Sequence, residues 1–155
     1  MSRRWLVGGS AATIIGLMLA TSSIVGASTA DTYPTFTVVE RATTDVVIDL
    51  GAPGDSLGDS LAFGNQVFNA ANTKKVGRDQ GSCIRVKVGK AWECSWTTFL
   101  KDGQIVVQGP FFDDGSDSTL AITGGTGKYA GVRGEMVLHF RNDLGTEFDF
   151  TFILH

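Results

Sequence analysis

The densest group of side chains that could take part in chemistry is the run Trp92-Glu93-Cys94-Ser95-Trp96. Alternation along a β-strand would place Trp92, Cys94 and Trp96 on one face and the two residues between them on the other. If the tryptophan face points inward, the interior is aromatic, contains sulfur and suits an apolar ligand. The alternative is that these tryptophans only fill the core.

Other polar and aromatic candidates lie on separate predicted strands, at Glu40, Asn65, Cys83 and Phe111. The sequence has no pattern for a metal site, because neither of its two histidines, His139 and His155, has ligand spacing with a cysteine. We therefore expect no metal.

Two further segments invite a ligand-binding interpretation. Asp113, Asp114 and Asp117 lack the spacing of an EF-hand calcium loop, so they are interpreted as a solvated acidic turn. The segment Thr123-Gly124-Gly125-Thr126-Gly127 could cradle a phosphate, but no Lys-Ser/Thr pair and no amphipathic helix follow it. We interpret it as a glycine-rich turn between strands and predict no cofactor.

The first thirty residues have the three parts of a secretory signal. Arg3 and Arg4 precede an apolar stretch from about Leu6 to Val25, and the small residues Ala27-Ser28-Thr29-Ala30 follow. We predict a signal peptide over residues 1–30, of the general secretory or twin-arginine type, with cleavage after Ala30. The protein would then be secreted, periplasmic or part of the cell envelope. The alternative is that the apolar stretch is kept as a membrane anchor.

Export bears on Cys83 and Cys94, the only two cysteines, because oxidising compartments allow thiols to pair. A hairpin that turns around Val88 and Gly89 would place Cys83 opposite Cys94 on the same face. A disulfide is therefore predicted, although a turn shifted by one residue would separate the two cysteines.

The charge of the chain argues against nucleic acid as a partner. The formal net charge is −3, and the part after Ala30 has eleven basic against sixteen acidic residues. The only basic cluster, Lys74, Lys75 and Arg78, is interpreted as a solvated strand end rather than a phosphate-binding face.

Residues 31–155 contain several short runs in which apolar and polar residues alternate, bounded by Gly, Asp and Asn. The clearest run is 148–154, where Phe148, Phe150, Phe152 and Leu154 share one face. The other predicted strands are 36–42, 46–50, 60–69, 82–88, 91–100, 104–111, 119–123 and 131–141. About eight antiparallel strands in one small domain predict an all-β fold, a closed barrel or a sandwich.

The sequence from Gly58 onward resembles the allene oxide cyclase family and the related dirigent proteins. The resemblance rests on four blocks and two later glycines, Gly131 and Gly134. The blocks are Gly58 to Asn65, Lys75-Val76-Gly77 with Gly81-Ser82-Cys83, Val107-Gln108-Gly109-Pro110-Phe111, and Leu120 to Gly127. The resemblance implies a single antiparallel eight-stranded barrel over residues 31–155.

In plant members of the family, an unstable fatty-acid epoxide is converted to a cyclopentenone inside an apolar barrel, mostly by positioning. Glu40 resembles the first-strand carboxylate of the family, Asn65 matches its second-strand Asn, and Cys83 matches its cavity Cys. Two positions depart from the plant pattern: Phe111 stands in place of a Tyr, and Ala42 in place of a polar, water-holding residue. The resemblance also implies assembly as a homodimer or homotrimer.

These observations lead to three hypotheses for function. The first is an isomerase or cyclase that acts on a hydrophobic small molecule, with Glu40 and Asn65 as catalytic residues. Its cavity or ligand-binding residues would be Cys83, Trp92, Cys94, Trp96 and Phe111. The second is a non-catalytic, dirigent-like or ligand-binding barrel, and the third is a structural envelope protein whose lumen is only its core.

Overall fold

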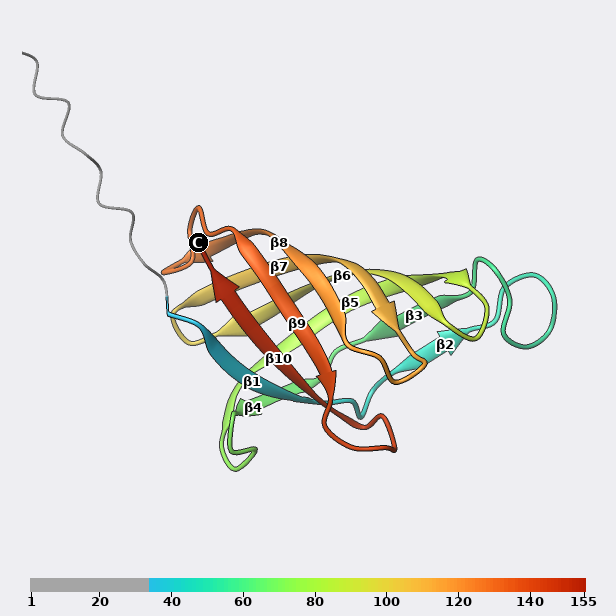
Figure 1. Ribbon diagram of the computed structural model, residues 1–155, viewed down its shortest axis with the longest axis horizontal. Coiled ribbons are helices and arrows are strands. Elements are labelled where there is room, and N and C mark those ends of the chain that lie inside the picture. Colours follow the sequence, from blue (N-terminus) through green and yellow to red (C-terminus); the bar gives the residue numbers. More distant parts are fainter. Residues whose placement is uncertain (1–33) are drawn as a thin grey trace, which may run out of the picture. The chain divides into compact units, whose positions relative to one another are not determined.

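Ten antiparallel strands make up the computed structural model, which describes residues 34–155 (Figure 1). The predicted signal peptide and its cleavage site lie outside the described residues and stay predictions. The strands are β1 (Phe36–Arg41), β2 (Val46–Ile48), β3 (Ser60–Phe63), β4 (Gln66–Asn69), β5 (Lys75–Lys87), β6 (Ala91–Leu100), β7 (Gly103–Phe112), β8 (Ser118–Gly127), β9 (Gly134–Phe140) and β10 (Glu147–Leu154). Residues 34–155 include no helix that could cross a bilayer.

Eight of these strands form a closed barrel, as the sequence predicts. Neighbouring strands pair in the order β5-β4-β1-β10-β9-β8-β7-β6, and the pairing of β5 with β6 closes the ring. The long strand β5 pairs with β4 through its first residues and with β3 further along, and β2 adds to the outer edge of β3. Closure satisfies backbone groups that an open sheet would leave at its edges.

The interior of the barrel holds the apolar faces that alternation predicts. Phe148, Phe150, Phe152 and Leu154 of β10 are buried, as are Trp92, Cys94 and Trp96 of β6. Ile105, Leu120 and Met136, on β7, β8 and β9, are fully buried against them. The core is therefore the lumen itself, filled by side chains from every strand of the regular β6–β10 meander.

Three strand predictions differ from the structure. The predicted strand 60–69 is broken at Gly64 and Asn65 into β3 and β4. Strand β5 begins at Lys75 rather than Ser82, and the guanidinium of Arg78 lies 3.8 Å from the centre of the Phe99 ring. The stretch 123–127 is the end of β8 and not a turn.

Two glycines of that stretch, Gly125 and Gly127, allow close approach of neighbouring backbone. A Cβ on Gly125 would lie 2.7 Å from the carbonyl oxygen of Gln104 and closer still to that of Tyr129. Only glycine fits at position 125, because the backbone carbonyl groups of Gln104 and Tyr129 leave no room for a side chain.

Candidate functional site

The site begins at a break in the barrel wall. The chain leaves β1 after Arg41 and resumes in β2 at Val46, and it leaves β3 after Phe63 and resumes in β4 at Gln66. The buried side chain of Asn65 fills this break, because its Oδ1 accepts hydrogen bonds from the backbone N–H groups of Thr43 (2.9 Å) and Thr44 (3.0 Å). The amide thus replaces the partner strand that these N–H groups lack.

The same amide holds two carboxyl groups. Asn65 Nδ2 donates to Glu40 Oε1 at 2.8 Å and to Asp45 Oδ1 at 2.7 Å. The backbone N–H of Asn65 donates to Asp79 Oδ1 at 3.0 Å, and its backbone carbonyl accepts from the N–H of Asp79. Glu40 and Asp79 are 5% and 0% exposed, so two carboxyl groups are buried around one asparagine.

Burial changes the protonation of this pair. It raises the pKa of Glu40 well above its usual range, and the negative charges of Asp79 and Asp45 act in the same direction. Burial likewise raises the pKa of Asp79, to about 7, although the hydrogen bond from the Asn65 backbone opposes the shift. Near neutral pH the pair therefore holds a proton inside the barrel.

Glu40 lies beside a small apolar cavity of about 40 Å³ in the lumen. The cavity is lined on its other sides by the rings of Phe63, Trp96 and Phe150 and by the Cys83–Cys94 pair, among others. Its volume is enough for small groups or water, since one water needs about 10 to 15 Å³. It is far smaller than the roughly 300 to 1,000 Å³ of a typical ligand pocket.

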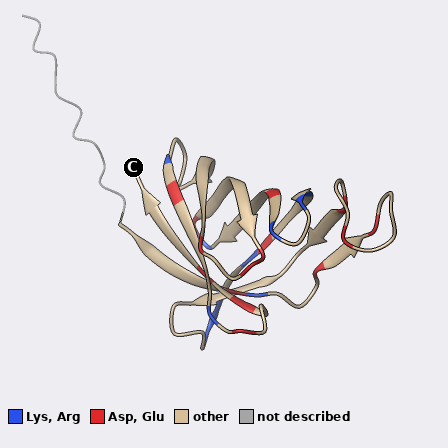
Figure 2. Cartoon of the chain, turned by 45° about the vertical axis from the view of Figure 1, so that its right-hand side comes forward, with Lys and Arg blue, Asp and Glu red and all other residues tan. Residues whose placement is uncertain are grey.

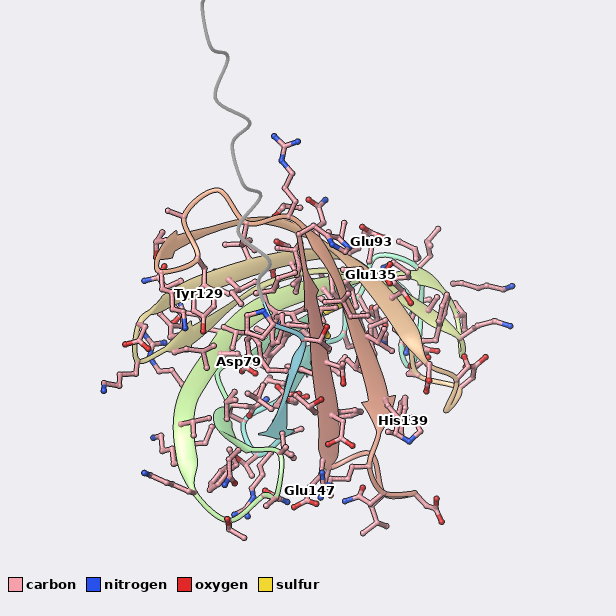
Figure 3. All side chains as sticks on the ribbon, turned by 60° about the vertical axis from the view of Figure 1, so that its left-hand side comes forward. Asp79, Glu93, Tyr129, Glu135, His139 and Glu147 are labelled. Carbon is pink, nitrogen blue, oxygen red and sulfur yellow. A yellow bond between two sulfur atoms is a disulfide. The ribbon has the colours of Figure 1, made fainter. Side chains whose placement is uncertain are left out.

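An open vestibule of about 860 Å³ lies at one end of the lumen. Asp45, Phe111 and Phe148 line both the cavity and the vestibule, so they mark the passage between the two. The loops after β7 and β9 form the rest of the rim, with His139 on its β9 side (Figure 3). A ligand in the vestibule could therefore place one end in the cavity beside Glu40.

Most of the predicted cavity residues line the lumen. Cys83, Cys94, Trp96 and Phe111 line the cavity, and Glu40 and Asn65 are brought together as described. Trp92 lies elsewhere: its ring is stacked under the Arg85 guanidinium at 3.9 Å, and its Nε1 donates to Asp113 Oδ2 at 3.0 Å. Trp92 thus packs against an ion pair outside the cavity, because β6 reaches the barrel end at that residue.

The disulfide between Cys83 and Cys94 is confirmed. The two residues are directly opposite each other on β5 and β6, with Cα atoms 4.0 Å apart, and β5 turns into β6 at Val88-Gly89-Lys90 as predicted. The bridge forms part of the cavity wall.

Two acidic residues of the site, Asp45 and Asp79, are missing from the sequence predictions. Asp79 was missed because the predicted strand began at Ser82. The available signal is the alternation of Gly77, Asp79, Gly81 and Cys83, which all lie on the inward face of β5. Figure 3 shows Asp79 among the side chains inside the barrel, and Glu135 on the outer face of β9.

No group of three or more His, Cys, Asp or Glu side chains within residues 34–155 is arranged to hold a metal ion. The carboxyl cluster instead relies on an amide and on a retained proton. What this arrangement can do chemically is move that proton between a buried carboxyl group and a molecule in the lumen.

Comparisons with known proteins agree with this geometry. A family model described as allene oxide cyclase matches residues 36–154, which include every strand of the barrel. Among solved structures, the chain is similar to a pyocyanin demethylase, with 27% sequence identity and a TM-score of 0.67. The match covers 79% of this chain and 100% of that one.

Two more distant similarities concern the fold alone. A pterocarpan synthase dirigent protein shares 18% identity and a TM-score of 0.64, with 78% of this chain and 92% of that chain covered. An exo-specific intermolecular Diels-Alderase shares 14% identity and a TM-score of 0.62, with 78% and 96% covered. The barrel described above is thus a scaffold shared with dirigent and ring-forming proteins.

Proposed function

The chain belongs to the allene oxide cyclase family, and on that premise we propose that it binds a hydrophobic small molecule at the mouth of its lumen and steers its cyclisation or isomerisation. The relatives support a barrel that controls the course of such reactions, since one is a dirigent protein and another a Diels-Alderase.

The observation that carries the proposal is the buried Glu40 at the cavity wall, which accepts a hydrogen bond from Asn65 and whose pKa is raised by burial and by the charge of Asp79. A protonated Glu40 can give its proton to an oxygen or nitrogen of the ligand and then take one from a ligand carbon. The two transfers balance in an isomerisation. General acid–base catalysis of this kind accelerates a reaction by about 10² to 10⁴-fold.

The dimensions of the lumen decide how a ligand would bind. The cavity beside Glu40 holds about 40 Å³, so only the reacting end of a substrate fits there. The remainder would occupy the vestibule, against Phe111 and Phe148. A flexible or conjugated molecule held with one end in the cavity and the rest in the vestibule has few conformations left. That restriction supplies the conformational steering on which such barrels rely.

A second candidate function is a non-catalytic barrel that only binds a ligand or serves as a structural envelope protein. The cavity of about 40 Å³, lined by the Cys83–Cys94 bridge and the Trp96 ring, favours it, because this volume is far below that of a typical ligand pocket. The two functions differ in whether the Glu40 proton moves.

The experiment compares the protein with its Glu40→Gln variant. A glutamine has the shape of glutamate and can still accept from Asn65 Nδ2, so the fold is retained while the mobile proton is lost. Glu135→Gln on the outer face of β9 is the matched control. The first probes are pyocyanin, because the pyocyanin demethylase is similar, and a freshly generated allene oxide. Quenching of tryptophan fluorescence measures binding, and mass spectrometry of the probe in D₂O measures proton transfer.

We expect both variants to bind the probe as the unchanged protein does. Turnover should fall by about 10² or more in Glu40→Gln and stay unchanged in Glu135→Gln. Equal turnover in Glu40→Gln would leave conformational steering as the mechanism and remove the proton transfer. Binding without turnover in the unchanged protein would establish the non-catalytic barrel, and absence of binding would establish the structural role.

We further propose that the protein is exported and that its N-terminal segment is removed after Ala30. The Cys83–Cys94 disulfide supports this location, because such bonds persist in oxidising compartments. Intact mass of the protein recovered outside the cytoplasm tests it: a mass that starts at Asp31 is expected, and one that retains Met1 on membrane-bound material would contradict cleavage.

A further inference from the structure

The charges along the ligand path are unbalanced. Asp45 lines both the cavity and the vestibule, and Asp113, Asp114 and Asp143 line the vestibule. Among residues 34–155, no Lys or Arg lines either space. Acidic residues, drawn in red, mark several of the loops (Figure 2).

Part of this negative charge is neutralised by neighbouring cations. Asp113 pairs with Arg85 at 2.7 Å and Asp114 with Lys90 at 3.5 Å. Asp45 and Asp143 have no ion pair among the described residues. Asp45 therefore carries uncompensated charge at the passage from the vestibule to the cavity.

Aromatic rings form the wall beside this charge. The rings of Phe111, Phe140 and Phe148 contact one another, with centroids 4.9 to 5.9 Å apart, and all three line the vestibule. The faces of aromatic rings attract cations, and a flat conjugated molecule can pack against them. Trp96 lines the cavity, and its buried indole N–H has no hydrogen-bond partner among the described residues, so it is a free donor near the ligand path.

We propose that the lumen and its vestibule select a positively charged, conjugated ligand over neutral and anionic molecules of the same shape. This inference rests on the proposed function and names the substrate class of that site. A ligand carboxylate would meet the charge of Asp45 with no Lys or Arg to pair with, which disfavours free fatty acids. A cation would instead be attracted by Asp45 and by the phenylalanine rings.

The test uses three tricyclic probes that differ in charge: 10-methylacridinium, acridine at pH 8, where it is neutral, and 9-anthracenecarboxylate. Their dissociation constants are measured by fluorescence titration of the full chain at low ionic strength, and again with added salt. We expect methylacridinium to bind about ten-fold more tightly than acridine, which corresponds to about 1.4 kcal/mol. The carboxylate should bind most weakly, and salt should weaken only the binding of the cation.

A matched pair of variants locates the effect. An asparagine at position 45 can still accept from Asn65 Nδ2, so Asp45→Asn removes the charge and keeps the hydrogen bond. Asp102→Asn makes the same change in the pocket at the other end of the barrel, beside Tyr129. Circular dichroism checks that both variants fold. We expect Asp45→Asn to weaken methylacridinium binding about three- to ten-fold and to leave acridine binding unchanged. Asp102→Asn should change the binding of neither probe.

The outcomes separate this inference from the proposed function. If acridine binds and methylacridinium binds no more tightly, charge selection is overturned while ligand binding stands. An equal loss of affinity in Asp45→Asn and Asp102→Asn also overturns it, because the attraction would then come from the net charge of the chain. If none of the three probes binds, both proposals fall.

Discussion

The two halves of the barrel wall are built differently. From β6 to β10 the strands follow one another as continuous hairpins, and their inward residues are almost all apolar, as Val107, Ile122 and Leu138 illustrate. From β1 to β5 the wall is interrupted twice, and its buried residues include Glu40, Asn65, Asp79 and Arg85. We call these the regular half and the interrupted half.

The contrast shows how a small barrel can hold charge. In an unbroken strand, every backbone N–H and C=O group is hydrogen-bonded to a neighbouring strand. No N–H group is then left to donate to a buried carboxyl group. The interruption at Asn65 frees an amide and a backbone N–H, and these bind Glu40, Asp45 and Asp79. The regular half supplies the aromatic surface and the interrupted half supplies the polar chemistry.

The largest expected effect comes from removing the residue that fills the break. Asn65→Ala leaves the N–H groups of Thr43 and Thr44 and the Glu40 carboxyl group without their partner, and unsatisfied groups cost about 1 to 3 kcal/mol each when buried. We expect the free energy of unfolding to fall by roughly 3 to 4 kcal/mol, measured by urea denaturation.

Asn69→Ala is the control for this change. The Asn69 amide also caps backbone N–H groups, those of Thr73 and Lys74, but in an exposed turn where water can replace it. Its loss should cost about 1 kcal/mol or less. Equal losses of unfolding free energy in the two variants would mean that the position of Asn65 at the break does not explain its contribution to stability.

The second effect concerns the bond that joins the halves. The Cys83–Cys94 disulfide links β5 of the interrupted half to β6 of the regular half, across a sequence separation of 11 residues. Replacing both cysteines by Ala should lower the free energy of unfolding by about 2 to 3 kcal/mol, because the unfolded chain gains freedom. The wild-type protein treated with a reductant should show a similar loss of unfolding free energy. If neither experiment lowers the free energy of unfolding, the disulfide does not stabilise the fold.

The third effect is a pH dependence that belongs to the interrupted half. The folded state raises the pKa of Asp79 to about 7, chiefly through burial, so it keeps a proton that the unfolded chain loses near pH 4. The folded state binds more protons in this window, so its contribution to stability is present at low pH and is lost as the pH rises toward 7. Urea midpoints should therefore fall between about pH 5 and pH 8 in the unchanged protein.

Asp79→Asn should remove part of this fall, because an amide has no proton to lose and still accepts from the Asn65 N–H, while the raised pKa of Glu40 leaves the remainder. The urea midpoint of the variant is measured at about pH 5 and about pH 8, as for the wild-type protein. The difference between the two proteins gives the contribution of Asp79 to the pH dependence. A slope as steep as that of the wild-type protein would assign the pH dependence to groups other than Asp79.

The same division explains what could be predicted from the sequence. Period-two alternation predicts the regular half well, as in the buried Phe148, Phe150 and Phe152, because each residue there obeys one local rule. The disulfide followed from the hairpin register. The break at Asn65 was not predicted, since Gly64-Asn65 lies within an alternating run and the reason for the break is a set of distant N–H groups.

Glu40 and Asn65 were identified through the family resemblance, whereas Asp79 was not. Its importance depends on burial and on the neighbouring carboxyl group of Glu40, and neither is visible in the residues around it. The placement of Trp92 outside the cavity also depends on a tertiary contact, the Arg85 guanidinium. Buried polar networks are thus where local rules carry the least information.

The smallest effect is expected where the two halves face each other. Thr98 of β6 lies directly opposite Asp79 on β5, is 0% exposed, and has a hydroxyl group without a hydrogen-bond partner among the described residues. Thr98→Val replaces that hydroxyl by a methyl group of similar size. Since no bond is lost and an unpaired polar group is removed, we expect the free energy of unfolding to rise slightly, by less than about 1 kcal/mol. Urea denaturation at neutral pH measures it. A loss of more than about 1 kcal/mol would show that the hydroxyl serves the buried carboxyl pair, and the polar site would then extend into the regular half.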